Sequence, residues 1–344
     1  MENYKHYIGI DLHSKHCYIV VMNKSGKITK RAKIITNEKD ILEILCSLKG
    51  KKAVTFEETT LAHWMYILLI SHNVADKIVV CSQKTKTGPK TDYKDATELA
   101  DLLRVNRLKP VFHEDNPRME LRTLVSGYND LIKDLTRMKN RDKALYRKSA
   151  IPVGGKKVYK DTSFNNLLIS KTDRFVEKQY FNQIALLEEQ KELYLKKFEQ
   201  NIKKFPEMKN IITVPGFSIV RTNILVGIII TPWRFPTKYN FFSYAELTKH
   251  EQTSDGKSYG NKKAYGRSEL KNIFKAATQN TIRGKNAFNR KYNEMRINGS
   301  TDKSAQNAVA KALASTVLAV WKTGKKYKDY YREVKQKENS QNRT

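Results

Sequence analysis

The fold of this chain is decided by residues 7–13, which read Tyr-Ile-Gly-Ile-Asp-Leu-His. This run is apolar and contains β-branched residues, as a buried strand does, and it carries one acid, Asp11, close to its end. Residues 54–57, Val-Thr-Phe-Glu, form a second apolar run that ends in the acid Glu57. Side chains at the carboxyl ends of neighbouring parallel strands lie at one edge of a sheet. The two runs therefore predict an α/β layer with carboxylates gathered at one edge.

Strand-like and helical patterns alternate around these two runs. A hairpin turn signal, Asn23-Lys24-Ser25-Gly26, separates the second and third of three predicted strands. A three-strand meander followed by strand–helix units is the order found in ribonuclease-H-like folds, and it implies a partly parallel sheet. The predicted strands are 6–12, 16–22, 27–35, 53–56 and 77–81, and the predicted helices are 37–48, 61–71 and 95–104.

Two further acids, Asp92 and Asp95, stand three residues apart at the start of the last of these helices. Residues three apart share one face of a helical turn, so both carboxylates can face the strand ends. Carboxylates are the ligands that Mg²⁺ or Mn²⁺ prefers, and two such ions can support phosphoryl transfer. The four acids Asp11, Glu57, Asp92 and Asp95 are therefore the predicted metal ligands and catalytic residues.

Each of these acids also has a structural interpretation. An acid after a strand often forms a turn, and Asp92 could be the N-cap of the helix that follows. Glu58 competes with Glu57, and Glu98 or Asp101 could replace one of the later acids. The strand-end placement and the order of the four acids together favour a metal site over four separate structural roles.

The charge balance indicates a polyanionic partner. The 344 residues include 65 Lys and Arg against 35 Asp and Glu, which gives a net charge of +30. Such a basic excess favours nucleic acid, with binding that weakens steeply as salt rises. A protein from a Lys-rich proteome would have a similar composition, so the acidic set is needed to favour chemistry on phosphates.

The chain shows no disulfide framework, zinc motif or membrane segment. Its three cysteines are odd in number and have no CxxC spacing. Its start has no apolar signal-peptide core, and the longest apolar stretch, 224–231, is too short to span a bilayer. We therefore expect a cytoplasmic, nucleoid-associated protein with no membrane partner.

Two long helices are predicted in the middle of the chain. From Leu121 to Met138, apolar residues recur at alternating spacings of three and four, and a second helical run covers about 172–204. A Gly- and Lys-rich break at 152–157 separates them. The pair suggests an antiparallel coiled-coil arm for dimerisation or reach, and an ordinary helical hairpin packed on its own domain explains the pattern equally well.

A third, mostly helical region follows. Residues 214–217, Val-Pro-Gly-Phe, precede an apolar run at 219–230, and residues 251–267 have the composition of a loop. Helices are predicted at about 268–297 and 303–323. The predicted domains are 1–113 (α/β), 114–206 (arm) and 207–330 (mostly helical), followed by a disordered tail at 331–344.

The chain resembles the transposases of insertion-sequence family 110, which includes the 116 and 902 groups and Piv-type DNA invertases. That family carries a RuvC-like N-terminal domain with an Asp-Glu-Asp-Asp set and a C-terminal transposase domain with a nucleophilic serine. The resemblance extends over nearly the whole chain. Its matching pieces are residues 9–13 (GIDLH), 56–59 (FEET), 90–96 (KTDYKDA), 214–217 (VPGF) and 234–236 (RFP).

The same resemblance places the catalytic serine at Ser254. The family motif reads roughly Gly-Leu-x-Pro, four residues, then Ser-Gly, and residues 246–256 correspond to it. The chain departs from the motif because Glu246, Lys249 and Asp255 replace Gly, Pro and Gly. Ser243 and Ser258 are nearby competitors.

The resemblance implies a recombinase that works in a larger assembly. A serine would attack a DNA phosphodiester with metal assistance, and one chain's C-terminal domain would dock on another chain's RuvC-like domain. The implied partners are donor and target double-stranded DNA, a structured non-coding guide RNA and further copies of the chain as a dimer or tetramer.

Two other functions fit the residues. A structure-specific nuclease of the Holliday-junction resolvase type would need the four acids but no serine, and would use a metal-activated water. A non-catalytic nucleic-acid-binding relative would explain the altered residues around Ser254.

Overall fold

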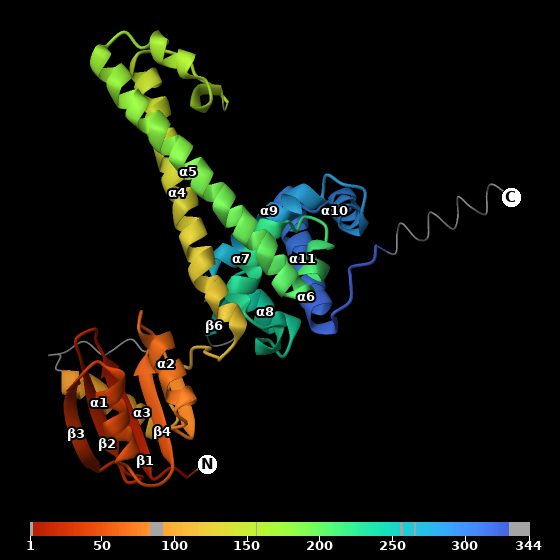
Figure 1. Ribbon diagram of the computed structural model, residues 1–344. Coiled ribbons are helices and arrows are strands. Elements are labelled where there is room, and N and C mark those ends of the chain that lie inside the picture. Colours follow the sequence, from red (N-terminus) through yellow and green to blue (C-terminus); the bar gives the residue numbers. More distant parts are fainter. Residues whose placement is uncertain (1–2, 83–91, 156, 255–256, 265, 330–344) are drawn as a thin grey trace. The chain divides into compact units, whose positions relative to one another are not determined.

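The computed structural model describes residues 3–82, 92–155, 157–254, 257–264 and 266–329. It divides into two compact units, residues 1–115 and 116–344 (Figure 1). The first unit is mixed α/β and the second is mostly helical, which confirms the predicted fold class at that level. The finer predicted boundaries stay predictions, and the predicted tail at 331–344 lies outside the described residues.

The first unit is built on a five-stranded mixed sheet of strand order β3-β2-β1-β4-β5. The first three strands form the predicted antiparallel meander, and β4 and β5 continue the sheet in parallel with β1. Parallel neighbours need crossover connections, and helices α1 (Glu38–Cys46) and α2 (Ala62–Ser71) supply them. The strands are β1 (His6–Leu12), β2 (His16–Met22), β3 (Ile28–Ile35), β4 (Lys52–Glu57) and β5 (Lys77–Cys81).

Helices cover both faces of this sheet. Because side chains alternate along a strand, Ile8 and Ile10 of β1 enter the core with α1 and α2, while Tyr7 enters the core with helix α3 (Asp92–Arg104). Gly9 and Asp11 share the face of Tyr7. The central strands of the sheet are therefore buried on both sides, as expected for an α/β layer, whereas the edge strand β3 has no buried residue.

Helix α3 lies unusually close to β1 at Gly9. A Cβ atom on Gly9 would lie 2.1 Å from the carbonyl oxygen of Ala96 and 2.6 Å from the amide nitrogen of Ala100. Only glycine on the strand and small residues on the helix permit this approach. Since Ala96 and Ala100 are one turn apart, the contact fixes the depth of α3 on the sheet.

The direction of α3 follows from its two ends. Tyr93 packs edge-to-face on Tyr18, with ring centroids 5.1 Å apart, and Tyr18 is the strand partner of Asp11. At the other end, a Cβ on Gly26 would lie 3.4 Å from the Arg104 guanidinium, and Gly26 lies in the turn that joins β2 and β3. Helix α3 thus runs antiparallel to β1, and its first turn lies at the carboxyl end of that strand.

The second unit contains the two predicted long helices, α4 (Glu120–Lys148) and α5 (Lys171–Lys204). They pack antiparallel: Tyr128 contacts Phe198 near one end, and Leu135 and Met138 contact Ile184 further along (Figure 1). Near Val125 the pair also packs against α7 (Ile219–Ile229). The observed structure is thus a helical hairpin whose base belongs to the core of its own unit.

An acidic layer interrupts the apolar seam of this hairpin. Asp142 follows Met138 on the buried stripe of α4 and is 1% exposed, and Glu177 of α5 is 2% exposed. Glu177 accepts hydrogen bonds from Asn165 and from the Tyr146 hydroxyl. Among the described residues, neither carboxylate oxygen of Asp142 has a hydrogen-bond partner. Burial, followed by the charge of Glu177, raises the pKa of Asp142 to about 7.

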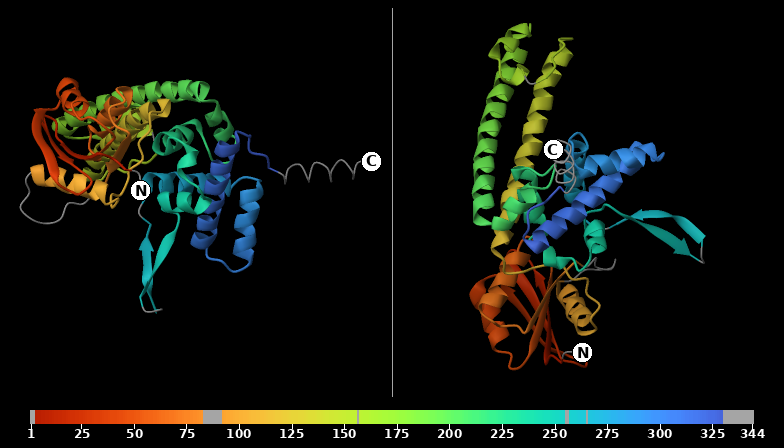
Figure 2. Two further views of the ribbon diagram at one scale, coloured as in Figure 1. Left: turned by 90° about the horizontal axis from the view of Figure 1, so that it is seen from below. Right: turned by 90° about the vertical axis from the view of Figure 1, so that its right-hand side faces the viewer.

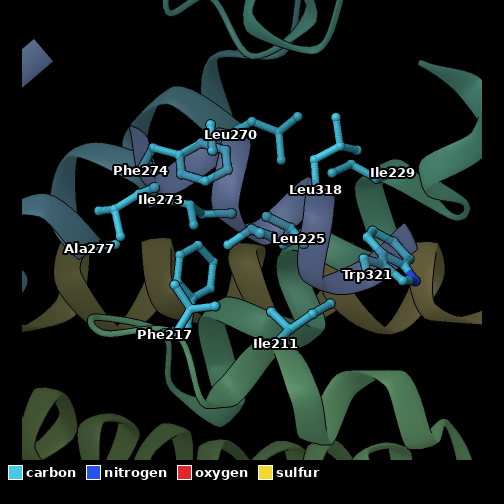
Figure 3. Packing of buried hydrophobic residues seen from close by; sticks show 14 of the residues in the cluster. Ile211, Phe217, Leu225, Ile229, Leu270, Ile273, Phe274, Ala277, Leu318 and Trp321 are labelled. Atoms are coloured by element: carbon cyan, nitrogen blue, oxygen red, sulfur yellow. The ribbon is translucent and has the colours of Figure 1, made fainter. Parts of the chain in front are cut away.

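The remaining helices form one apolar core. Phe217, Leu225, Phe274 and Trp321 are among the buried residues that meet there (Figure 3). Within the described residues, no helix is both long enough and apolar enough to cross a membrane. The helices are α6 (Pro206–Ile212), α7, α8 (Lys238–Tyr244), α9 (Ser268–Thr281), α10 (Ala287–Ile297) and α11 (Asp302–Thr323).

The structure corrects two predictions in this region. Residues 251–267 were expected to form a loop, but strands β6 (Lys249–Ser254) and β7 (Lys257–Lys263) form an antiparallel ribbon there. The predicted helical span 268–297 is broken between α9 and α10, where Asn286 caps the new helix by accepting from the amide of Phe288. The ribbon has no apolar alternation, so its sequence lacks the usual strand signal.

The cysteines are all free thiols. Cys17 and Cys81 are buried in the first unit, and burial raises the pKa of each to about 11. Both therefore stay protonated near neutral pH and act as small core side chains, since only the thiolate is a strong nucleophile or metal ligand.

Because of the acidic layer, we predict that the stability of the α4–α5 hairpin depends on pH. Because the folded protein holds the Asp142 proton up to about pH 7 and the unfolded chain releases it near pH 4, stability should fall as pH rises between these values. Asp142→Leu should remove this slope and raise the free energy of unfolding at pH 8 by roughly 2 kcal/mol. Urea unfolding followed by circular dichroism at pH 5 and pH 8 measures both effects.

The control for this test is Asp134→Leu, because the Asp134 side chain is about half exposed on the same helix and pairs with Arg137. This control should keep the pH dependence of the native protein. An Asp142→Leu protein that loses as much stability between pH 5 and pH 8 as the native protein would contradict the assignment.

Candidate active site

Asp11 and Glu57 lie side by side at the carboxyl edge of the sheet. Strands β1 and β4 are parallel with Ile10 opposite Phe56, so the next residues, Asp11 and Glu57, stand at the same level. Neighbouring strands are roughly 4.8 Å apart, which makes the two acids direct neighbours. Ile10 and Phe56 enter the core on the opposite face, so alternation directs both acids to the side of α3.

Asp11 is also paired with a residue that the sequence did not single out. The Nε2 atom of His13 lies 3.0 Å from Oδ2 of Asp11. The Asp11 side chain is 16% exposed, whereas the His13 side chain is largely exposed. His13 can therefore orient the Asp11 carboxylate from the solvent side of the edge.

Asp92 and Asp95 belong to the first turn of α3, which lies at this same edge. Asp95 is half-buried, and Asp92 is the first residue of the helix. The side chain of Asp92 is outside the described residues. Acidic residues are common in the first turn of a helix because the positive end of the helix dipole lies there.

The donor chemistry of this edge fits a hard divalent cation. Its candidate ligands are carboxylates, which are the ligands of Mg²⁺ and Mn²⁺ rather than of zinc. Among the described side chains, no three His, Cys, Asp or Glu residues converge closely enough to hold a metal ion. The structure thus brings Asp11 and Glu57 together and places the helix turn that carries the other two acids at the same edge.

Two of the competing acids of the first unit, Glu58 and Asp101, have other partners. Glu58 Oε2 lies 2.5 Å from Nε2 of His113, whose side chain is only 2% exposed. The His113 ring in turn stacks on His63. Asp101 forms an ion pair with Arg104 near the opposite end of α3. Glu57, rather than Glu58, is therefore the acid beside Asp11, and Asp101 lies away from this edge.

Ser254 is in the second unit. It is the last residue of β6 and pairs with Lys257 of β7, next to the ribbon's turn. Its side chain is outside the described residues. Of its competitors, Ser258 lies on β7 opposite Thr253, and Ser243 lies on α8 with its hydroxyl 3.4 Å from that of Thr248.

The backbone before β6 has a glycine-like conformation at the position where the chain departs from the motif's glycine. Glu246, which corresponds to the motif's glycine, has φ of +51° in the left-handed region that favours glycine. Glu246 is buried, and its carboxylate lies 4.0 Å from the Lys271 ammonium group. The turn is therefore the one that glycine would form, although the side chain differs.

Comparison with known families finds two matching models. The DEDD transposase model of the IS110 type matches residues 8–148, which include all four acids. The model described as Transposase IS116/IS110/IS902 family matches residues 208–293, which include Ser254. No curated protein matches the chain. The two matches together span most of the sequence, and the chain belongs to the IS110 family of transposases.

Proposed function

We propose that this insertion-sequence transposase cuts and rejoins DNA strands with Ser254 as nucleophile and with Asp11, Glu57, Asp92 and Asp95 as metal ligands. The observation that carries the proposal is the register of β1 and β4, which makes Asp11 and Glu57 neighbours at the edge where α3 begins. The sheet order, an antiparallel meander followed by parallel strands, supports a RuvC-like, ribonuclease-H-like first unit.

The four acids would hold Mg²⁺ or Mn²⁺. When bound, such an ion supplies charge stabilisation at the phosphoryl oxygens and lowers the pKa of a coordinated hydroxyl. The chain's own residues prepare this edge: His13 orients Asp11, and the first turn of α3 carries Asp92 and Asp95.

Ser254 would carry the covalent step. Its Oγ forms a bond to phosphorus and gives up its proton to a base or to water. The bond from phosphorus to O3′ breaks, and O3′ takes up a proton from a base or from water to leave as a 3′-hydroxyl. A serine hydroxyl is a weak nucleophile at neutral pH and needs such activation. The phosphoserine keeps the energy of the broken linkage, so attack by a 3′-hydroxyl can rejoin strands without ATP.

The α4–α5 hairpin would act as a coiled-coil arm that joins two copies of the chain. Its helix α5 exposes apolar side chains at Phe175, Leu186 and Leu193. Leu186 and Leu193 are one heptad apart, the spacing by which helices of a coiled coil meet. A dimer or tetramer would supply acids from one protomer and Ser254 from another.

A structured guide RNA would direct the protein to donor and target DNA. The net charge of +30 supports a large polyanionic partner. In such a division, base pairing reads sequence and the protein holds backbones.

A nuclease of the Holliday-junction resolvase type is the second candidate function, and inversion of DNA by the same serine chemistry is a variant of the first. One observation favours the nuclease. All four acids lie in the first unit, whereas Ser254 lies in the second. Such an enzyme would use water in place of the serine.

Asp11→Asn tests the acidic site. It removes a ligand charge while keeping the side chain's size, so Mn²⁺ binding by titration calorimetry should be lost and strand cleavage should fall at least 100-fold. DNA binding should stay within twofold. Asp101→Asn is the matched control, because Asp101 pairs with Arg104 away from the edge. Unchanged cleavage in Asp11→Asn would refute the metal site.

Ser254→Ala tests the nucleophile. The native protein should form a covalent adduct with labelled DNA on a denaturing gel, and the variant should form none. Ser258→Ala, a change on the partner strand of the same ribbon, should retain the adduct. An adduct that persists in Ser254→Ala would refute the assignment. Cleavage by the native protein without any adduct would favour the nuclease.

Sequencing the RNA that copurifies with the protein tests the guide. We expect one discrete, structured RNA that is recovered in roughly stoichiometric amount. Capture with antisense oligonucleotides should then recover the protein. A mixture of unrelated cellular fragments would contradict a dedicated RNA partner, while leaving the serine and metal predictions standing.

A further inference from the structure

The described side chains of the ribbon that carries Ser254 form no buried face. Every described side chain of β6 and β7 is exposed, at 249, 251–253 and 257–262. An isolated two-stranded hairpin is marginally stable in water. The ribbon extends away from the helices of its own unit (Figure 2). Such a feature gains its full stability only when a partner covers it.

The base of the ribbon is firmly attached to the helices. The two strands themselves, β6 and β7, are here called the blade. The amide of Leu247 donates to the Phe242 carbonyl at the entry, and the amide of Arg267 donates to the Tyr244 carbonyl at the exit. A Cβ on Gly266 would lie 2.2 Å from that same Tyr244 carbonyl oxygen. Ala264 is buried between these contacts. The ribbon is therefore anchored at its base, while its strands are exposed to solvent.

The exposed blade is basic. Lys249, Lys257 and Lys262 are exposed on it, against a single acid, Glu251, among its described residues. Positive charge on a surface with no apolar face favours a polyanion over a protein or lipid partner.

An aromatic side chain is displaced from the ribbon's ladder near Ser254. The register shifts from Gln252 opposite Gly260 to Thr253 opposite Ser258, so Tyr259 is an extra residue in a β-bulge. Tyr259 is 71% exposed. Bulges redirect side chains beside functional sites. Lys257 is the strand partner of Ser254, and Tyr259 is two residues beyond Lys257, a distance of roughly 7 Å along the strand. This distance equals about two base-pair steps of DNA.

We propose that the β6–β7 ribbon enters the major groove of duplex DNA outside the stretch paired with the guide RNA, and that Tyr259 packs against a nucleotide close to the phosphate that Ser254 attacks. The B-form major groove, about 12 Å wide, admits a two-stranded ribbon, whereas the A-form groove of RNA is too narrow. In the major groove of a duplex, an aromatic ring can make apolar contact with a base edge, such as the methyl group of thymine. This inference rests on the proposed function of Ser254.

The test compares Tyr259→Ala with Tyr239→Ala in the full chain. Tyr239 is similarly exposed, at 66%, but lies on α8 outside the ribbon. Fluorescence anisotropy would measure binding to a labelled DNA duplex and to an RNA duplex of the same sequence. We expect Tyr259→Ala to weaken DNA binding about tenfold because the buried apolar area of the ring is lost. Tyr259→Phe should restore binding, and Tyr239→Ala should stay within twofold.

The outcomes separate this inference from the proposed function. Equal DNA binding by Tyr259→Ala and Tyr239→Ala overturns the ribbon contact, whether or not Ser254 forms an adduct. Loss of RNA duplex binding to the same extent overturns the choice of DNA. A native protein that binds neither duplex and forms no adduct overturns the proposed function itself. Lys257→Gln with Lys262→Gln should reduce the salt dependence of DNA binding by about two ions.

Discussion

The close approach of α3 to β1 at Gly9 is the constraint on which the acidic site depends. A hydrogen atom in place of a side chain lets the backbone of Ala96 and Ala100 touch the strand. The helix is thereby set at a depth and direction that bring its first turn to the edge where Asp11 and Glu57 emerge. A larger residue at position 9 would move α3 outward and separate the two halves of the carboxylate set.

Much of the first unit could be predicted from sequence because its signals are local. Buried strands show as short apolar runs, and Asp11 and Glu57 stand at their ends. The long helices could be predicted because their buried stripe recurs every three or four residues, from Leu121 to Met138. The sequence does not give the strand register. Only the pairing of Ile10 with Phe56 in the structure shows that Asp11 and Glu57 are at the same level.

The features that the sequence did not reveal depend on contacts through space or on missing periodicity. His113 is far along the chain from Glu58, so their pairing has no local signature. Strands β6 and β7 carry polar residues on both faces and therefore have the composition of a loop. The acidic layer of Asp142 and Glu177 stands at core positions of two separate helices, which only their packing reveals. Functional and strained places are where local rules fail.

Because the ribbon is attached only at its base, a small rotation there would become a larger displacement at its far end. Strand β6 has six residues, so the blade is about 20 Å long at roughly 3.3 Å per residue. A rotation of about 10° at the base would move its far end by about 3.5 Å, close to the rise of one base pair. If Ser254 attacks DNA as proposed, the hydrogen bonds that anchor Leu247 and Arg267 would set the position at which a strand is cut, although neither residue is at the far end of the ribbon.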